Sequence, residues 1–268
     1  MEGKRKKWKK MLMAVSAVML AAGLAVIIQK NMDYQKGAND YSEAEQIAGT
    51  AAWETPGIHE SEDPEGERQK ETAEKETDPY IQSLAQLNIE ALKEINDEVI
   101  GWIIIPNSQV SYPLIQGADN SYYLERTWKK EKSAVGSIFL ECQVSKDLSD
   151  FNTIIYGHRM RNGSMFGSLE QYKEETYWRE HPRVYIVSGQ EVHCYEIYAV
   201  YEAGVRDLTY HLKIEDPEKK EEFIRFGKEH SVIDTGIEPA AKDRIITLST
   251  CTGRGYRTRW VVQAAEYR

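Results

Sequence analysis

Short apolar runs separated by turn residues fill the C-terminal two thirds of the chain. Eight of these runs are rich in β-branched and aromatic residues, which is typical of strands. They are VIGWIIIP (99–106), VSYPLIQG (110–117), GSIFLEC (136–142), NTIIYGH (152–158), RVYIVS (183–188), VHCYEIYAVYEAG (192–204), RIITLSTC (244–251) and RWVVQAA (259–265). Short strands with tight connections predict an all-β barrel or sandwich, and not a parallel α/β sheet.

Helical periodicity interrupts this pattern in three places. Five apolar positions predict an amphipathic helix before the first strand: Ile81, Leu84, Leu87, Ile89 and Leu92. A second helical segment is predicted near residues 164–172. A longer helix is predicted over residues 217–229, between the sixth and seventh strands, because Pro217 suits a helix start and Phe223, Ile224 and Phe226 supply an apolar face.

The N-terminus joins a basic segment, MEGKRKKWKK at residues 1–10, to an uncharged run from Met11 to Ile28. About 18 apolar residues are the lower limit for a membrane-spanning helix. We therefore predict a cytoplasmic tail at 1–10, a single transmembrane signal anchor at 11–29 and an extracellular remainder, because basic flanks stay in the cytoplasm. A cleaved signal peptide is the alternative, but the small residues 21–23 lie inside the apolar run. The basic flank argues against a buried soluble helix.

Residues 30–78 are polar, acidic and poor in large apolar side chains. Such a segment cannot bury enough surface to fold alone, so it predicts a flexible, solvated linker. Residues 79–268 then form one domain of about 190 residues, long enough to bury its own core. The net charge of −9 predicts that the protein has no nucleic-acid partner.

The chain has three cysteines, Cys142, Cys194 and Cys251. An odd count in an exported protein leaves at least one thiol unpaired. A disulfide between Cys142 and Cys194 is one possibility. The alternative, which the strand-like surroundings of both residues favour, is that each is a small buried apolar side chain.

Candidate chemistry gathers at the ends of three predicted strands. Cys251 ends the seventh strand and precedes a glycine-bearing turn, so its thiol is held by the sheet and faces a loop. His158 ends the fourth strand in the same way, and it can take the thiol proton and return it to a leaving amine. An isolated cysteine at such a place is more often a packing residue, and an isolated histidine is more often a surface residue.

Arg259 opens the last strand shortly after Cys251. Two strands joined by a short loop are neighbours, which predicts that Arg259 lies beside the thiol. A guanidinium does not act as a base, but it can hydrogen-bond an oxyanion. Arg254 and Arg257, in the loop between the two strands, compete for the same role.

Four segments, taken together and in order, resemble the sortase family, and class B in particular. TLSTC at 247–251 resembles the nucleophile motif T-L-x-T-C, and NTIIYGH at 152–158 with NGSMFGSL at 162–169 resembles the histidine segment. RWVVQA at 259–264 is similar to the final arginine strand, and NSQVSYPLIQGADNSYYL at 107–124 also resembles class B chains. The likeness extends over residues 84–268.

The resemblance implies a closed eight-stranded β-barrel with added helices, including an N-terminal helix. It implies a cysteine transpeptidase that needs no cofactor and no metal. Cys251 would attack the threonine carbonyl of a C-terminal sorting signal in a secreted protein and form a thioester. A cell-wall amine, from a peptidoglycan precursor or cross-bridge, would then resolve the thioester. His158 would serve as acid and base, and Arg259 would stabilise the oxyanion.

The resemblance also suggests substrate-binding residues. Asn120 and Leu124 match the class B DN…YL stretch, and Ser249 and Thr252 flank the nucleophile. Tyr210 belongs to the loop after the sixth strand, which is expected to wall the groove. Gly253 departs from the family, since some class B chains carry an acidic residue there; any scheme that needs this carboxylate is in doubt for this chain.

Other functions share part of this pattern. An exported cysteine peptidase that only hydrolyses would use Cys251 and His158 but leave the arginine strand unexplained. A non-catalytic surface-binding β-domain would bury Cys251. A pilus-assembling sortase would differ in its substrates, and neither the sorting-signal sequence nor the acceptor amine follows from these residues.

Overall fold

Eight strands close into a barrel in the computed structural model, which describes residues 2–50, 78–253 and 257–267. The strands are β1 (Val99–Ile104), β2 (Ser111–Ile115), β3 (Ile138–Leu140), β4 (Asn152–Tyr156), β5 (Arg183–Ser188), β6 (Glu191–Gly204), β7 (Ile245–Cys251) and β8 (Thr258–Glu266). Their order around the barrel is β1-β2-β3-β4-β7-β8-β6-β5, and β5 closes the ring on β1. The predicted closed eight-stranded barrel is confirmed.

Two pairs in this ring are parallel, β2 with β3 and β4 with β7, and the other pairs are antiparallel. A parallel pair cannot be joined by a tight turn, so its two strands come from distant parts of the chain. The pairing of β4 with β7 therefore brings together two strand ends that are far apart in the sequence, and it does so over five consecutive residue pairs.

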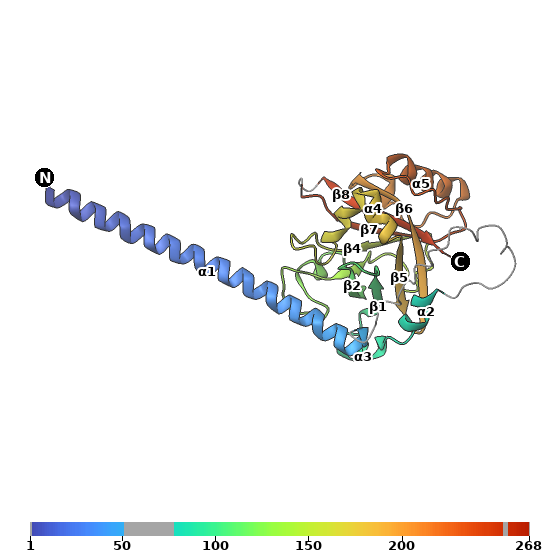
Figure 1. Cartoon of the computed structure of the whole chain (residues 1–268), viewed down its shortest axis with the longest axis horizontal. Helices are drawn as coiled ribbons and strands as arrows, with labels where there is room; N and C mark the ends of the chain where they lie inside the picture. Colours follow the sequence, from blue (N-terminus) through green and yellow to red (C-terminus); the bar gives the residue numbers. More distant parts are fainter. Residues whose placement is uncertain (1, 51–77, 254–256, 268) are drawn as a thin grey trace, which may run out of the picture.

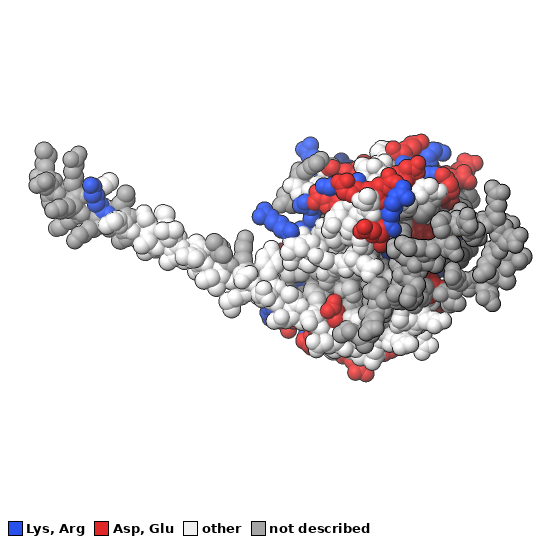
Figure 2. Space-filling model, in the orientation of Figure 1, with Lys and Arg blue, Asp and Glu red and all other residues white. Residues whose placement is uncertain are grey.

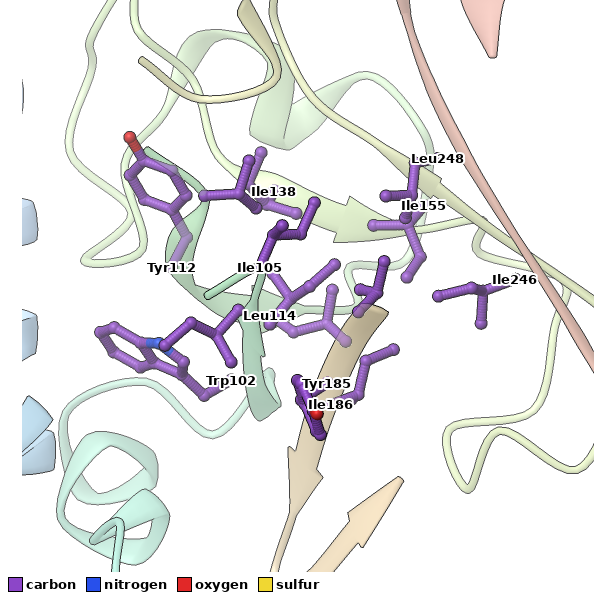
Figure 3. Close-up of a cluster of buried hydrophobic side chains, with 14 of the residues drawn as sticks. Trp102, Ile105, Tyr112, Leu114, Ile138, Ile155, Tyr185, Ile186, Ile246 and Leu248 are labelled. Atoms are coloured by element: carbon purple, nitrogen blue, oxygen red, sulfur yellow. The ribbon is translucent and has the colours of Figure 1, made fainter. Parts of the chain in front are cut away.

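The barrel interior is filled by aliphatic and aromatic side chains that point toward one another (Figure 3). Residues from all eight strands meet there, among them Leu114, Ile155, Ile186, Leu248 and Val262, which are all buried. Each fully buried Leu or Ile contributes about 1.5–3 kcal/mol relative to an exposed one. This interior gives the strand ends above it a rigid base.

Helices and 3-10 turns fill the connections. The predicted helix at 81–92 is two helices, α2 (Pro79–Leu84) and α3 (Ile89–Ile95), because Asn88 starts α3 as a cap that accepts from the Ala91 N–H. The segment near 164–172 is a 3-10 helix, η3 (Gly167–Lys173), followed by α4 (Glu175–Glu180). Two shorter turns are η2 (Tyr122–Glu125) and η4 (Leu208–Tyr210).

The long helix expected between the sixth and seventh strands is α5 (Pro217–His230). Asp216 caps it by accepting from the Glu218 N–H, and Pro217 occupies its first turn. Phe223 and Ile224 are buried, so the predicted apolar face packs on the barrel. Figure 2 shows acidic side chains, with basic ones among them, over the face that carries this helix.

Helix α1 (Glu2–Ala48) projects from the barrel and contacts it only with its C-terminal end (Figure 1). One stretch of it is long and apolar enough to cross a membrane, and none of that stretch is buried in the protein. Figure 2 shows uncharged side chains along the middle of the helix. The large apolar side chains there, such as Leu20 and Val18, are exposed.

The beginning of the expected flexible linker differs from the structure. Residues 30–48 continue α1, and five of them are buried against the domain: Gly37, Asp40, Tyr41, Ala44 and Ala48. Their spacing of three and four residues is that of one helix face. This face is made mainly of small residues, so it carries little hydrophobicity and resembles a solvated spacer in the sequence. The predicted linker residues 51–77 lie outside the described residues.

Candidate active site

Cys251 and Arg259 lie directly opposite each other at the open end of the β7–β8 ladder. The antiparallel register runs without interruption from the Ile245–Ala265 pair to the Cys251–Arg259 pair. Residues opposite each other in such a ladder point to the same face, with Cβ atoms about 5 Å apart. Both side chains are half-buried, so the sulfur and the guanidinium share one partly open edge.

His158 lies at the neighbouring strand end. Tyr156 in β4 pairs with Ser249 in β7, and the Gly157 N–H donates to the Ser249 carbonyl at 3.2 Å. Both strands run in the same direction, and His158 and Cys251 each follow this pair by two residues. The end of β4, the end of β7 and the start of β8 are thus neighbours in the sheet, and these strand ends lead to His158, Cys251 and Arg259.

The imidazole of His158 is oriented by a backbone carbonyl. Its Nε2–H donates to the Leu124 oxygen at 2.6 Å, and a carbonyl only accepts, so this nitrogen carries the proton. The other ring nitrogen, Nδ1, is then the one that can exchange a proton with a thiol. The ring is half-exposed.

Arg259 is held by its own strand end. Its Nη1 donates to the Thr258 carbonyl at 2.9 Å, and the Thr258 hydroxyl lies 3.3 Å from the Thr252 hydroxyl across the turn. Arg257 is exposed, and its carbonyl accepts from the Val205 N–H. Arg254, the other alternative to Arg259, lies outside the described residues. Of the two described arginines, Arg259 is the one paired with Cys251.

Tyr210 and Ser249 border the same edge. The Tyr210 hydroxyl lies 2.8 Å from the Ser249 Oγ. Burial raises the pKa of Tyr210 to about 12. The nearby Arg259 lowers this pKa, and the nearby Cys251 raises it. Tyr210 further lines a cavity of about 750 Å³ between η4 and the start of α5. The loop after the sixth strand therefore adjoins the thiol, as expected of a groove wall.

Asn120 belongs to a buried polar cluster that the sequence analysis missed. Its Nδ2 donates to Glu141 at 2.6 Å, and its Oδ1 accepts from the Cys142 N–H at 2.8 Å. The Tyr156 hydroxyl donates to the same Glu141 oxygen at 3.0 Å. Tyr156 belongs to the segment that resembles the histidine motif, and this position could have identified it as a residue near the site. Glu141 follows a buried strand, which is a common place for a glutamate and indicates no function.

Glu141 is only 5% exposed. Burial raises the pKa of its carboxyl, but the hydrogen bonds from Asn120, Tyr156 and Cys142 outweigh burial and lower it overall. Burial and the adjacent carboxylate raise the pKa of Tyr156. The cluster therefore contains an ionised carboxylate that holds Asn120 and Tyr156 in place.

The remaining predicted positions are distributed around the edge. Leu124 is 37% exposed, and its carbonyl accepts the hydrogen bond from the His158 ring. Thr252 is half-buried in the turn. Gly253 has a φ of +76°, and a Cβ there would lie 2.8 Å from Arg159 Nη1. Arg159 is ion-paired with Glu170, and its guanidinium lies beside Gly253.

The three thiols are all free. Cys194 is buried, and burial raises the pKa of its thiol to about 12, which makes it a packing residue. Burial and Glu141 also raise the pKa of Cys142. No disulfide joins Cys142 to Cys194. Among the described residues no group of three or more His, Cys, Asp and Glu side chains is placed to hold a metal ion.

Comparison with known proteins identifies the family. A profile described as Sortase domain matches residues 103–267. Sortase B of Listeria monocytogenes is 39% identical over 176 residues, covering 64% of this chain and 71% of that protein. Sortase B of Staphylococcus aureus is 30% identical over 162 residues, covering 60% and 66%.

Solved structures agree with this result. Sortase B from B. anthracis, in complex with AAEK1, has 30% sequence identity and a TM-score of 0.68, covering 88% of this chain and 99% of that chain. Clostridium perfringens sortase B has 32% identity and a TM-score of 0.63, covering 68% and 100%. The chain therefore belongs to the sortase family of cysteine transpeptidases, and within that family to class B. The comparisons favour neither a purely hydrolytic peptidase nor a pilus-assembling sortase.

Proposed function

We propose that Cys251, His158 and Arg259 together carry the transpeptidation. The pairing of β4 with β7 and of β7 with β8 supports this proposal, because it makes the strand ends that lead to these three residues neighbours. Sortases act on sorting-signal peptides and amine nucleophiles, so the edge must serve two reactions in turn. Each of the three residue types has a distinct task in both.

In the first reaction the Cys251 sulfur, as thiolate, attacks the threonine carbonyl carbon of the sorting signal. The carbonyl oxygen takes the charge, and Arg259 with nearby backbone N–H groups stabilises it. His158, now protonated, gives its proton to the departing amine as the C–N bond breaks. A thioester on Cys251 remains.

In the second reaction an acceptor amine replaces the leaving fragment. His158 takes a proton from the attacking amine, a new amide bond forms, and the sulfur leaves as thiolate. A peptidoglycan precursor or cross-bridge supplies this amine in our proposal. The class B relationship favours an Asn-Pro-x-Thr type of sorting signal.

The peptide groove in this proposal includes Asn120, Leu124, Ser249, Thr252 and Tyr210. Tyr210 and Ser249 are in contact beside the nucleophile, and Asn120 is held by Glu141. The cavity beside Tyr210 extends the groove toward α5. Asn120, Thr252 and Tyr210 would offer amide and hydroxyl groups to the extended peptide backbone and Leu124 an apolar side chain, while Ser249, which is 2% exposed, would hold Tyr210.

We also propose that α1 anchors the protein in the cell membrane as a single span. Its apolar middle is exposed in the protein and needs a lipid environment, and basic residues precede it. By the positive-inside rule the N-terminus lies in the cytoplasm and the barrel outside. This topology places the catalytic domain where secreted substrates and cell-wall amines meet.

Product analysis of peptide cleavage by the full chain in detergent tests the proposal. With an added amine such as triglycine, the expected product is the new amide; without it, slow hydrolysis is expected. An unchanged hydrolysis product at saturating amine would identify a peptidase instead. Trapping of a Cys251 thioester by mass spectrometry would locate the nucleophile.

A further inference from the structure

The C-terminal end of α1 packs against the loop that leads into β3. A Cβ on Gly37 would lie 2.9 Å from the Val135 side chain, so the helix approaches this loop closely. The Trp128 indole donates to the Asp40 carbonyl at 2.7 Å. Tyr41 is 6% exposed and lies at the centre of this contact.

The Tyr41 hydroxyl reaches the segment that supports the His158 ring. It donates to the Gly136 carbonyl at 2.5 Å and lies 3.2 Å from the Ser137 Oγ. Gly136 has a φ of +64°, and a Cβ there would lie 2.7 Å from both the His158 Cδ2 and the Leu124 oxygen. The Gly136 backbone therefore lies directly against the imidazole and against the carbonyl that orients it.

The Tyr41 ring reaches the other side of His158 through a second chain of contacts. It meets the Tyr112 ring edge-on, with centroids 5.2 Å apart. The Tyr112 hydroxyl accepts from the Met165 N–H at 2.9 Å. The next residue, Phe166, donates its N–H to the His158 carbonyl at 3.0 Å. One buried tyrosine on α1 thus supports both the ring and the backbone of the histidine.

We propose that Tyr41 is a positioning residue for His158, and that the barrel-proximal end of the anchor helix is part of the catalytic apparatus. This inference rests on the proposed role of His158. His158 lies beyond the end of β4, so no strand pairing fixes it, and the contacts described above take that place. Removing the Tyr41 hydroxyl leaves the Gly136 carbonyl without its donor and lets the segment shift away from the ring.

The test compares Tyr41→Phe with Tyr34→Phe in the full chain in detergent. Tyr34 is on the same helix and is 44% exposed, so it controls for changes to the helix. We expect Tyr41→Phe to lower kcat by about tenfold with KM within about twofold, because small displacements of a catalytic group reduce turnover. The Cε1–Hε1 NMR signal of His158 should shift in Tyr41→Phe and not in Tyr34→Phe.

The outcomes separate the inference from the proposed function. Wild-type kcat in Tyr41→Phe, or a loss of kcat with an unmoved His158 signal, would overturn the positioning role. Ser137→Ala gives a second reading if Tyr41→Phe is poorly folded by thermal unfolding, and it should shift the same ring signal. Wild-type turnover in His158→Ala would instead refute the proposed function itself.

Discussion

The two sides of the proposed active site are held by different kinds of interaction. Cys251 and Arg259 are opposite members of a continuous antiparallel ladder, so backbone hydrogen bonds set their positions. His158 lies two residues past the end of β4 and is held by loop carbonyls and by segments that α1 supports. Asn120, like His158, is held by contacts outside the strand ladders: its side chain donates to the buried carboxylate of Glu141.

This difference indicates where the enzyme is sensitive to distant substitutions. A ladder depends little on any one side chain, because each residue contributes its own N–H and carbonyl groups. A residue held by loops depends on the particular side chains that hold those loops. We therefore expect remote substitutions to affect proton transfer and peptide binding more than the position of the sulfur.

The largest expected effect comes from the ladder side. Cys251→Ala removes the nucleophile, so peptide cleavage should fall by about 10⁴-fold or more, and no acyl-enzyme should form. Intact-protein mass spectrometry after incubation with substrate measures this directly. The unfolding temperature should stay near that of the wild type, because the ladder remains. An acyl adduct on another residue would contradict the assignment of the sulfur.

His158→Ala should lower kcat by about 10²–10⁴-fold, because it removes the group that transfers the proton. Steady-state kinetics with a fluorogenic peptide checks this. The matched control is His193→Ala, since His193 is in β6, away from the ends of β4, β7 and β8. Equal losses in both variants would show that general destabilisation, and not proton transfer, is being measured.

Arg259→Ala should lower kcat by about 10²–10³-fold through loss of oxyanion stabilisation. Arg257→Ala is the neighbouring control. It should retain activity, because Arg257 is exposed and the residue paired with Cys251 across the ladder is Arg259. The same fluorogenic assay compares them. Inactivation by Arg257→Ala together with a harmless Arg259→Ala would transfer the role to Arg257.

The smallest effect is expected for Glu141→Gln, which affects the cluster that holds Asn120. The variant should lose about 1–3 kcal/mol of unfolding free energy at pH 7, since a buried charged acceptor is removed, and KM should rise. The lowered pKa of Glu141 makes its contribution present above pH 4.5 and lost as the pH falls further. Urea unfolding should therefore show a smaller difference in unfolding free energy between the wild type and Glu141→Gln at pH 4 than at pH 7. Glu94→Gln, on an exposed position, should show no such difference at either pH.

Local pattern was sufficient to predict most of the barrel. The eight apolar runs became the eight strands, and the short loop before Arg259 predicted that it would be adjacent to Cys251. The parallel pairing of β4 with β7 depends on contacts between distant segments, so only the family resemblance connected His158 with Cys251. Glu141 was missed because Asn120 and Tyr156, which donate to it, come from two other segments of the chain.

The end of α1 was missed for a different reason. Its contact face uses Gly37, Ala44 and Ala48 with one aromatic residue, Tyr41. Small residues allow close approach of a helix but leave no hydrophobic run for a pattern search to detect. Polar residues on the other faces of the helix then dominate the composition, which suggested a linker.

A continuous helix from the apolar segment to the barrel also sets a distance. From Ile28 to Gly37 the backbone rises by about 14 Å at about 1.5 Å per residue. In the proposed topology the helix therefore keeps the reactive edge at a fixed distance from the lipid surface, whereas a flexible linker would allow that distance to vary. Substrate and acceptor must both be delivered to that narrow layer, which restricts the reaction to chains still close to the membrane surface.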